Sequence, residues 1–127
     1  MLEINPQIVC RLIELARVFH AQEEVVIPEE PENPGGDWPT QILASHAGDS
    51  ILEEFRVIVA DLEPDQQQQV VALLWLGRDD YGLEEWSDAV KQAAEDWNEN
   101  TADYLVAHPL LADYLTEGLD LHGYDCE

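Results

Sequence analysis

The feature that most constrains the fold is a run of seven consecutive apolar residues, Val70 to Leu76. The pair Glu63-Pro64 upstream is typical of a helix start, and Gly77 directly after the run is typical of a helix end. A helix that is apolar on every face has to be covered on several sides. We therefore expect a central helix at about 64–77 with other helices packed around it.

Other segments have the periodicity of amphipathic helices that could cover it. A first helix starts at Asn5 and Pro6 and continues to about His20, with apolar residues at three- and four-residue steps. A second helix follows Asp49 or Ser50, and two short helices close the chain, the last one starting at Pro109 with Gly118 and Gly123 loosening its end. A helix after the central one places its apolar residues at Leu83, Trp86, Val90, Ala93 and Trp97.

No stretch alternates apolar and polar residues with a β-branched bias, so we expect a compact all-α bundle of five or six helices. Between the first and second helices lie four prolines, a Gly-Gly pair and five glutamates. Prolines deny the backbone its helical geometry, so this segment is expected to be extended. The chain therefore reads as one domain, 1–127, made of an N-terminal helix (1–21), an extended acidic connector (22–41) and a helical core (42–127).

The charge balance limits the partners. Against 28 acidic residues stand only 5 Lys and Arg, which gives a formal net charge of -23, yet 46% of the residues are apolar. The charge therefore surrounds a real core instead of marking a disordered acidic tail. An acidic surface repels nucleic-acid phosphates and anionic lipids, so we expect no direct nucleic-acid or membrane partner.

The expected lack of a membrane span and of a signal peptide, together with the cysteine pattern, favours a cytoplasmic location. The longest apolar run is far shorter than the roughly 20 residues of a membrane span, and no basic segment followed by an apolar stretch opens the chain, so we expect no signal peptide. The two cysteines lack the regular spacing of a stapled secreted domain. We expect a reducing cytosol, with Cys10 as an inert buried thiol in the first helix.

Motifs for catalysis or metal binding are lacking. The four histidines are scattered, and no Cys or His pair has the spacing of a zinc site. The acidic stretch from Asp61 begins like a calcium loop, but Gln66 replaces its glycine and Ala72 its closing glutamate. No serine lies in a nucleophile elbow, and no glycine-rich phosphate loop occurs. We therefore predict no catalytic residues, no metal ligands and no cofactor.

The C-terminal third contains a short internal repeat. The string Ala102-Asp103-Tyr104-Leu105 recurs ten residues later as Ala112-Asp113-Tyr114-Leu115. Each Tyr-Leu pair is expected to pack while each aspartate faces a donor. Arg78, just past the central helix, is a natural partner, so we predict a salt bridge from Arg78 to Asp103 or Asp113. These three residues are expected to form a structural clasp or, alternatively, the edge of a pocket.

The same residues resemble those of a known family. The strings LLWLGR at 73–78, TADYL at 101–105 and PLLADYLTEGL at 109–119 are similar to those of a family of small acidic cytoplasmic proteins of proteobacteria, catalogued as a domain of unknown function. The resemblance is most specific between about Asp61 and Gly123. It implies a helical bacterial protein and supplies no activity. The family's usual Arg-Gly-Asp after the central helix appears here as Arg78-Asp79-Asp80, so this chain lacks the glycine.

Three functions remain open. The first is a non-catalytic adaptor that binds another protein through an acidic surface and an aromatic-edged groove, with Trp38, Tyr81 and Trp86 as the candidate binding surface. The second is a nucleic-acid mimic whose carboxylates occupy a basic protein. The third is a small-ligand protein or enzyme that uses carboxylates. Of these three functions we favour the adaptor. The sequence does not determine the oligomeric state.

Overall fold

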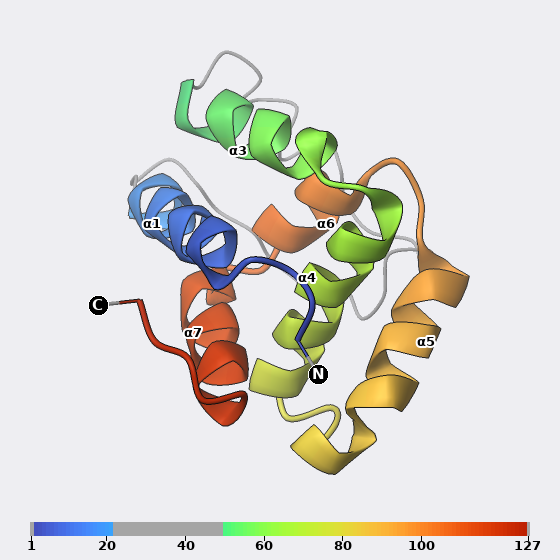
Figure 1. Cartoon of the computed structure of the whole chain (residues 1–127). Coiled ribbons are helices and arrows are strands. Elements are labelled where there is room, and N and C mark those ends of the chain that lie inside the picture. Colours follow the sequence, from blue (N-terminus) through green and yellow to red (C-terminus); the bar gives the residue numbers. More distant parts are fainter. Residues whose placement is uncertain (1, 22–49, 127) are drawn as a thin grey trace.

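The computed structural model describes residues 2–21 and 50–126, and both ranges are helical without any strand (Figure 1). A short 3₁₀ turn, η1 (Leu83–Glu85), leads into α5, and the all-α prediction is confirmed. The six α-helices in these ranges are α1 (Pro6–His20), α3 (Ser50–Asp61), α4 (Pro64–Gly77), α5 (Trp86–Asp96), α6 (Thr101–Val106) and α7 (Leu111–Leu121).

Helix α4 is the central helix, as its apolar run predicts. Every residue from Val70 to Leu76 is buried, and α5, α6 and α7 all pack against α4. Figure 1 shows α5 and α7 on opposite sides of α4, while α1 packs on α7 and α3, and α3 packs on α6. Burial of each large apolar side chain stabilises the fold by about 1.5–3 kcal/mol, so this arrangement follows from the need to cover α4.

The ends of the helices follow local sequence signals in most places. The Oδ1 atom of Asn5 accepts a hydrogen bond from the backbone N–H of Gln7 at 2.9 Å, so Asn5 caps α1 as predicted. Helix α7 begins at Leu111, two residues later than the predicted start at Pro109. The predicted connector and Trp38 lie outside the described residues.

The close crossing of α4 and α7 depends on two glycines. A Cβ atom built on Gly77 would lie 1.8 Å from the carbonyl oxygen of Tyr114, and one built on Gly118 would lie 2.5 Å from that of Leu73. The expectation that Gly118 loosens the end of the last helix is therefore wrong. Gly118 is buried in the middle of α7 and lets the two backbones approach.

The expected free thiol at Cys10 is also corrected. Cys10 in α1 and Cys126 after α7 form a disulfide, with their Cα atoms 5.5 Å apart. The packing of α1 against α7 brings together two residues that are 116 positions apart in sequence. Because the cysteines are paired, the argument from cysteine usage for a reducing compartment no longer holds, and the cytoplasmic location stays a prediction.

Candidate functional site

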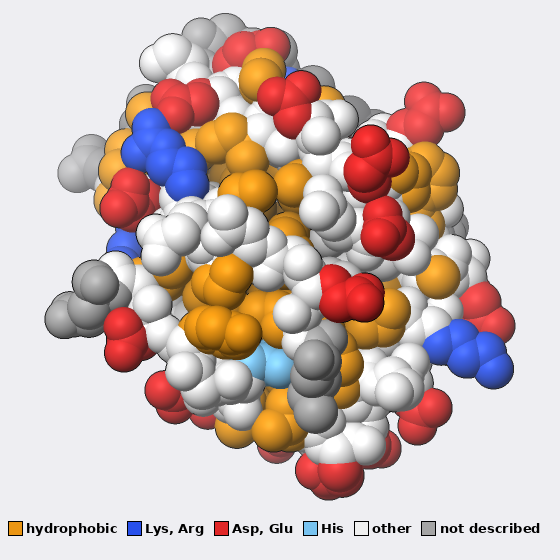
Figure 2. Space-filling model, in the orientation of Figure 1, with side chains coloured by type: hydrophobic (Ala, Val, Ile, Leu, Met, Phe, Trp, Pro, Cys, Tyr) orange, Lys and Arg blue, Asp and Glu red, His pale blue; other side chains and the backbone are white. Residues whose placement is uncertain are grey.

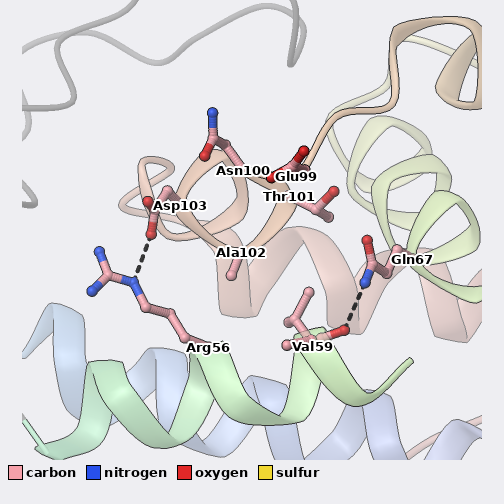
Figure 3. A pocket seen from close by; sticks show the side chains of 9 residues that line it. Arg56, Val59, Gln67, Glu99, Asn100, Thr101, Ala102 and Asp103 are labelled. Atoms are coloured by element: carbon pink, nitrogen blue, oxygen red, sulfur yellow. Dashed lines mark hydrogen bonds and ion pairs between the residues drawn. The ribbon is translucent and has the colours of Figure 1, made fainter. Parts of the chain in front are cut away.

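A polar pocket of about 190 Å³ lies between α3 and α6 (Figure 3). Helix α3 provides one wall, α6 and the two residues before it provide the opposite wall, and Gln67 of α4 completes the lining. Both walls carry polar and apolar side chains. Its residues are Arg56, Val59, Ala60, Gln67, Glu99, Asn100, Thr101, Ala102 and Asp103.

An ion pair joins the two walls of this pocket. The Nε atom of Arg56 donates to Oδ1 of Asp103 at 2.8 Å, and both side chains are 28% exposed (Figure 3). The pair is screened less than a fully exposed one, because both groups are partly withdrawn from water. Glu99 adds an exposed carboxylate to the lining, so the pocket has one guanidinium and two carboxylates and is net negative.

The floor of the pocket is fixed by Gln67. Its Nε2 atom donates to the carbonyl oxygens of Val59 at 2.9 Å and Leu62 at 3.2 Å, at the end of α3. Its Oε1 atom accepts from Nε1 of Trp97 at 2.8 Å. Gln67 is only 9% exposed, and a buried amide with its hydrogen bonds satisfied holds its neighbours in one arrangement. The pocket is therefore a stable feature of the α3–α4–α6 packing.

Arg78 lies elsewhere, in a second polar cluster beside α4. Its Nε and Nη2 atoms donate to Oδ2 of Asp80 at 3.0 and 2.8 Å, and its Nη1 atom lies 2.8 Å from Nε2 of His108. The predicted salt bridge from Arg78 to Asp103 or Asp113 is therefore wrong, since Asp103 pairs with Arg56 instead. The side chain of Arg78 reaches Asp80, in the loop that follows its own helix, and His108, just after α6. Asp113 lines a separate pocket beside α1.

Geometry fixes the protonation of His108, which is fully buried. Its Nδ1 atom lies 2.9 Å from the carbonyl oxygen of Tyr104 and 3.3 Å from that of Leu105. Carbonyl oxygens only accept, so Nδ1 carries the proton and Nε2 accepts from Arg78. Trp75 Nε1 donates to the hydroxyl of Tyr104 at 2.9 Å, and burial raises the pKa of Tyr104 to about 12. Tyr104 therefore stays neutral, and the cluster ties α4 to α6.

Two of the predicted contact aromatics, Tyr81 and Trp86, are not among the lining residues of the pocket. Tyr81 is partly buried and stacks on Trp75, with ring centroids 5.9 Å apart. Trp86 is 6% exposed and packs edge-on against His122. Trp38 lies outside the described residues. A binding role for these three side chains stays a prediction, and most of the surface of Trp86 already belongs to the core.

The aspartates of the internal repeat are separated. Asp103 is at the edge of the α3–α6 pocket, whereas Asp113 lines a different pocket of about 240 Å³ between α1 and α7. That second pocket also contains Arg17 and His20, and burial lowers the pKa of His20. Because the two aspartates meet different elements, the repeated string does not form one paired structure.

Sequence reasoning missed Arg56, Gln67 and Glu99. The signal for Arg56 is that a basic residue is rare here and lies on a helix whose other face is apolar. Gln67 is one of four consecutive glutamines, and only the helical register of α4 distinguishes the buried ones. Within residues 2–21 and 50–126, no three His, Cys, Asp or Glu side chains gather as a metal-ligand set. None of the helices in those ranges has the length and apolar character to cross a bilayer.

Fold and pocket together define a small all-α domain with a polar pocket between two of its helices. The chain belongs to a family described as protein of unknown function (DUF3775), whose profile matches residues 52–124. All residues that line the α3–α6 pocket lie inside this range, whereas α1 lies outside it. No curated protein and no solved structure matches the chain.

Proposed function

We propose that this chain is a non-catalytic binding domain that holds a basic segment of another protein in the pocket between α3 and α6. The observation that carries the proposal is the pairing of charge and shape in that pocket. Glu99 and Asp103 place two carboxylates in the lining against the single guanidinium of Arg56, and the apolar groups of Val59, Ala60 and Ala102 suit the methylene stem of a lysine or arginine.

The charge of the chain as a whole supports the same partner. Acidic side chains are distributed over the face in Figure 2 with few Lys or Arg among them, and the net charge is -23. Such a field attracts cationic segments from a distance and raises the rate at which they meet the protein. Arg56 does not oppose this attraction strongly, because Asp103 offsets its charge. The field steers the partner, and the pocket selects the side chain.

Binding of a short fluorescein-labelled lysine-rich peptide, followed by fluorescence anisotropy at about 0.15 M salt, tests the proposal. The double variant E99Q/D103N removes both carboxylates of the pocket. The control E84Q/E95Q removes the same charge from exposed positions that lie outside the pocket lining.

We expect the pocket variant to weaken binding at least about tenfold, the equivalent of one lost charge-assisted hydrogen bond. The control should change binding about twofold or less, the size expected for an exposed charge pair. Equal losses in the two variants would mean that the peptide binds the general acidic surface, and the pocket proposal would fail.

A further inference from the structure

The disulfide joins two cysteines that both lie outside the family-matched range. Cys10 is in α1, and Cys126 follows α7, while the match covers residues 52–124. The bond therefore fastens α1 and the C-terminal tail, defined here as residues 122–126, to each other across the surface of the matched helices. Neither cysteine is among the residues that the family profile matches.

The first residue of the tail is held against the helices: the ring of His122 packs on Trp86 with centroids 4.4 Å apart, and its backbone N–H donates to Leu119 at 3.0 Å. After α7 ends at Leu121, the backbone N–H of Gly123 donates to Asp120 at 2.9 Å, and that of Tyr124 donates to Leu119 at 3.0 Å. These bonds keep the tail near the end of α7, and the disulfide carries it on to α1. Tyr124 is 42% exposed, so apolar burial adds little there. Short segments of this kind open easily once their covalent anchor is removed.

The position of the tail creates a pocket. Tyr124, Asp125 and Cys126 face residues of α7 across a space of about 200 Å³, lined on the α7 side by Thr116, Glu117, Leu119 and Asp120. Because one wall consists of the tail, this pocket exists only while the tail is folded back. Reduction of the disulfide would therefore open this pocket, and its formation would close it.

We propose that the Cys10–Cys126 disulfide is a reversible redox site, reduced by a dithiol, that fastens and releases the C-terminal tail. The two sulfurs differ in access: Cys126 is exposed, whereas Cys10 is 9% exposed in the packed face of α1. Exchange proceeds by thiolate attack on a disulfide sulfur, and the exposed sulfur of Cys126 is the accessible target.

The chemical step balances with a dithiol as the only co-reactant. One thiolate of the dithiol attacks the sulfur of Cys126, and the electron pair of the broken S–S bond leaves with the sulfur of Cys10, which takes up a proton. The second thiolate of the dithiol then attacks its partner sulfur in the mixed disulfide and releases Cys126 as a thiol. The dithiol is oxidised to a cyclic disulfide, and the protein gains two electrons and two protons.

Reduction is expected to release the tail and leave the helices folded. Helix α1 keeps its place through its own apolar face, with Val9, Leu12 and Ile13 all buried against the core. Beyond His122, the residues of the tail up to Cys126 are exposed and have no comparable buried face. Release is therefore local, and the pocket beside α7 opens.

Two measurements on the full chain test the proposal. Thiol titration with Ellman's reagent in denaturant first counts free cysteines before and after treatment with dithiothreitol. Amide hydrogen exchange, read by mass spectrometry, then compares residues 122–126 with α6 as the internal reference. The variant C126S, which cannot form the bond, is measured with and without dithiothreitol as the matched control.

We expect no free thiols before reduction and two afterwards, as the bond requires. Exchange in the tail should rise at least about tenfold on reduction while α6 is unchanged. Tail exchange in C126S should equal that in the reduced protein and should not change when dithiothreitol is added. Free thiols in the untreated protein, unchanged tail exchange after reduction, or a rise in α6 equal to that in the tail would each overturn the proposal.

Discussion

At the scale of the residue, the most informative position is Asp79, directly after the C-cap of α4. Its φ of 69° lies in the left-handed region that favours glycine. The N–H of Asp80 donates to the carbonyl of Trp75 at 2.9 Å, and that of Asp79 donates to Leu76 at 3.2 Å. This pattern is a Schellman motif, in which glycine normally occupies the place of Asp79. Asp79 therefore occupies a backbone position that glycine would adopt without strain.

The variant D79G is expected to stabilise the protein by about 1 kcal/mol, because it relieves the left-handed strain and removes a negative charge from the negative end of a helix. D79N should give a smaller gain, because asparagine tolerates this conformation and only the charge is lost. D79A should lie well below D79G, since alanine is disfavoured at positive φ. Urea unfolding of the three variants checks the order, and D79A as stable as D79G would contradict it.

The buried cluster around Arg78 gives a second prediction at this scale. R78A leaves the Nε2 atom of His108 without its donor inside the core, which should cost about 1–3 kcal/mol. The control R11A removes the exposed pairs of Arg11 with Glu14 and Glu54 and should change stability by less than about 1 kcal/mol. Thermal unfolding measures both variants. Equal changes would mean that the exposed pairs matter as much as the buried contact.

At the scale of the element, the contact between α4 and α7 determines how the core closes. A helix that is apolar all round predicts several neighbours but does not say how close they come. The distance between α4 and α7 depends on Gly77 and Gly118, because their missing side chains let one backbone lie against the other. The sequence offered only a glycine near a helix end, a position where loosening is the usual interpretation. The point at which α4 and α7 cross cannot be predicted from the sequence, because it depends on how the two helices are rotated relative to each other.

The variant G118A tests this contact. In an exposed helix, alanine would add about 1 kcal/mol of stability over glycine. Here the new methyl group would meet the carbonyl of Leu73, so we expect a net loss of about 2 kcal/mol and a melting temperature lower by roughly 5–10 °C. S87A, at an exposed position in α5, is the control and should be neutral or slightly stabilising. A stabilised G118A protein would show that α7 can move away without cost.

At the scale of the whole molecule, the excess of acidic residues opposes the compact state. With a net charge of -23, the folded chain brings like charges closer together than the unfolded chain does. All five basic residues are in the described ranges, and three of them, Arg11, Arg56 and Arg78, form ion pairs with acids. Most carboxylates have no such partner available, because acids outnumber bases by so much. Repulsion between them should therefore lower the stability of the fold at low ionic strength.

We expect the melting temperature to rise when sodium chloride is increased from about 0.01 M to about 0.15 M, a change that shortens the screening length from roughly 30 to 8 Å. The triple variant E53Q/D65N/E95Q, which removes three exposed acids, should show a smaller rise. Differential scanning calorimetry measures both proteins. A melting temperature that is independent of salt in the parent protein would contradict the idea that repulsion limits its stability.

The sequence by itself determined the class of fold, several of the helix ends and the central position of α4. These follow from local physics, because caps, prolines and apolar periodicity act within a few residues. It did not determine the pocket between α3 and α6, the partners of Arg78 and Asp103, or the bond between Cys10 and Cys126. Each of these joins positions brought together only when particular helix faces meet, and Cys10 and Cys126 are 116 residues apart. Tertiary packing alone decides which of many possible partners a side chain reaches.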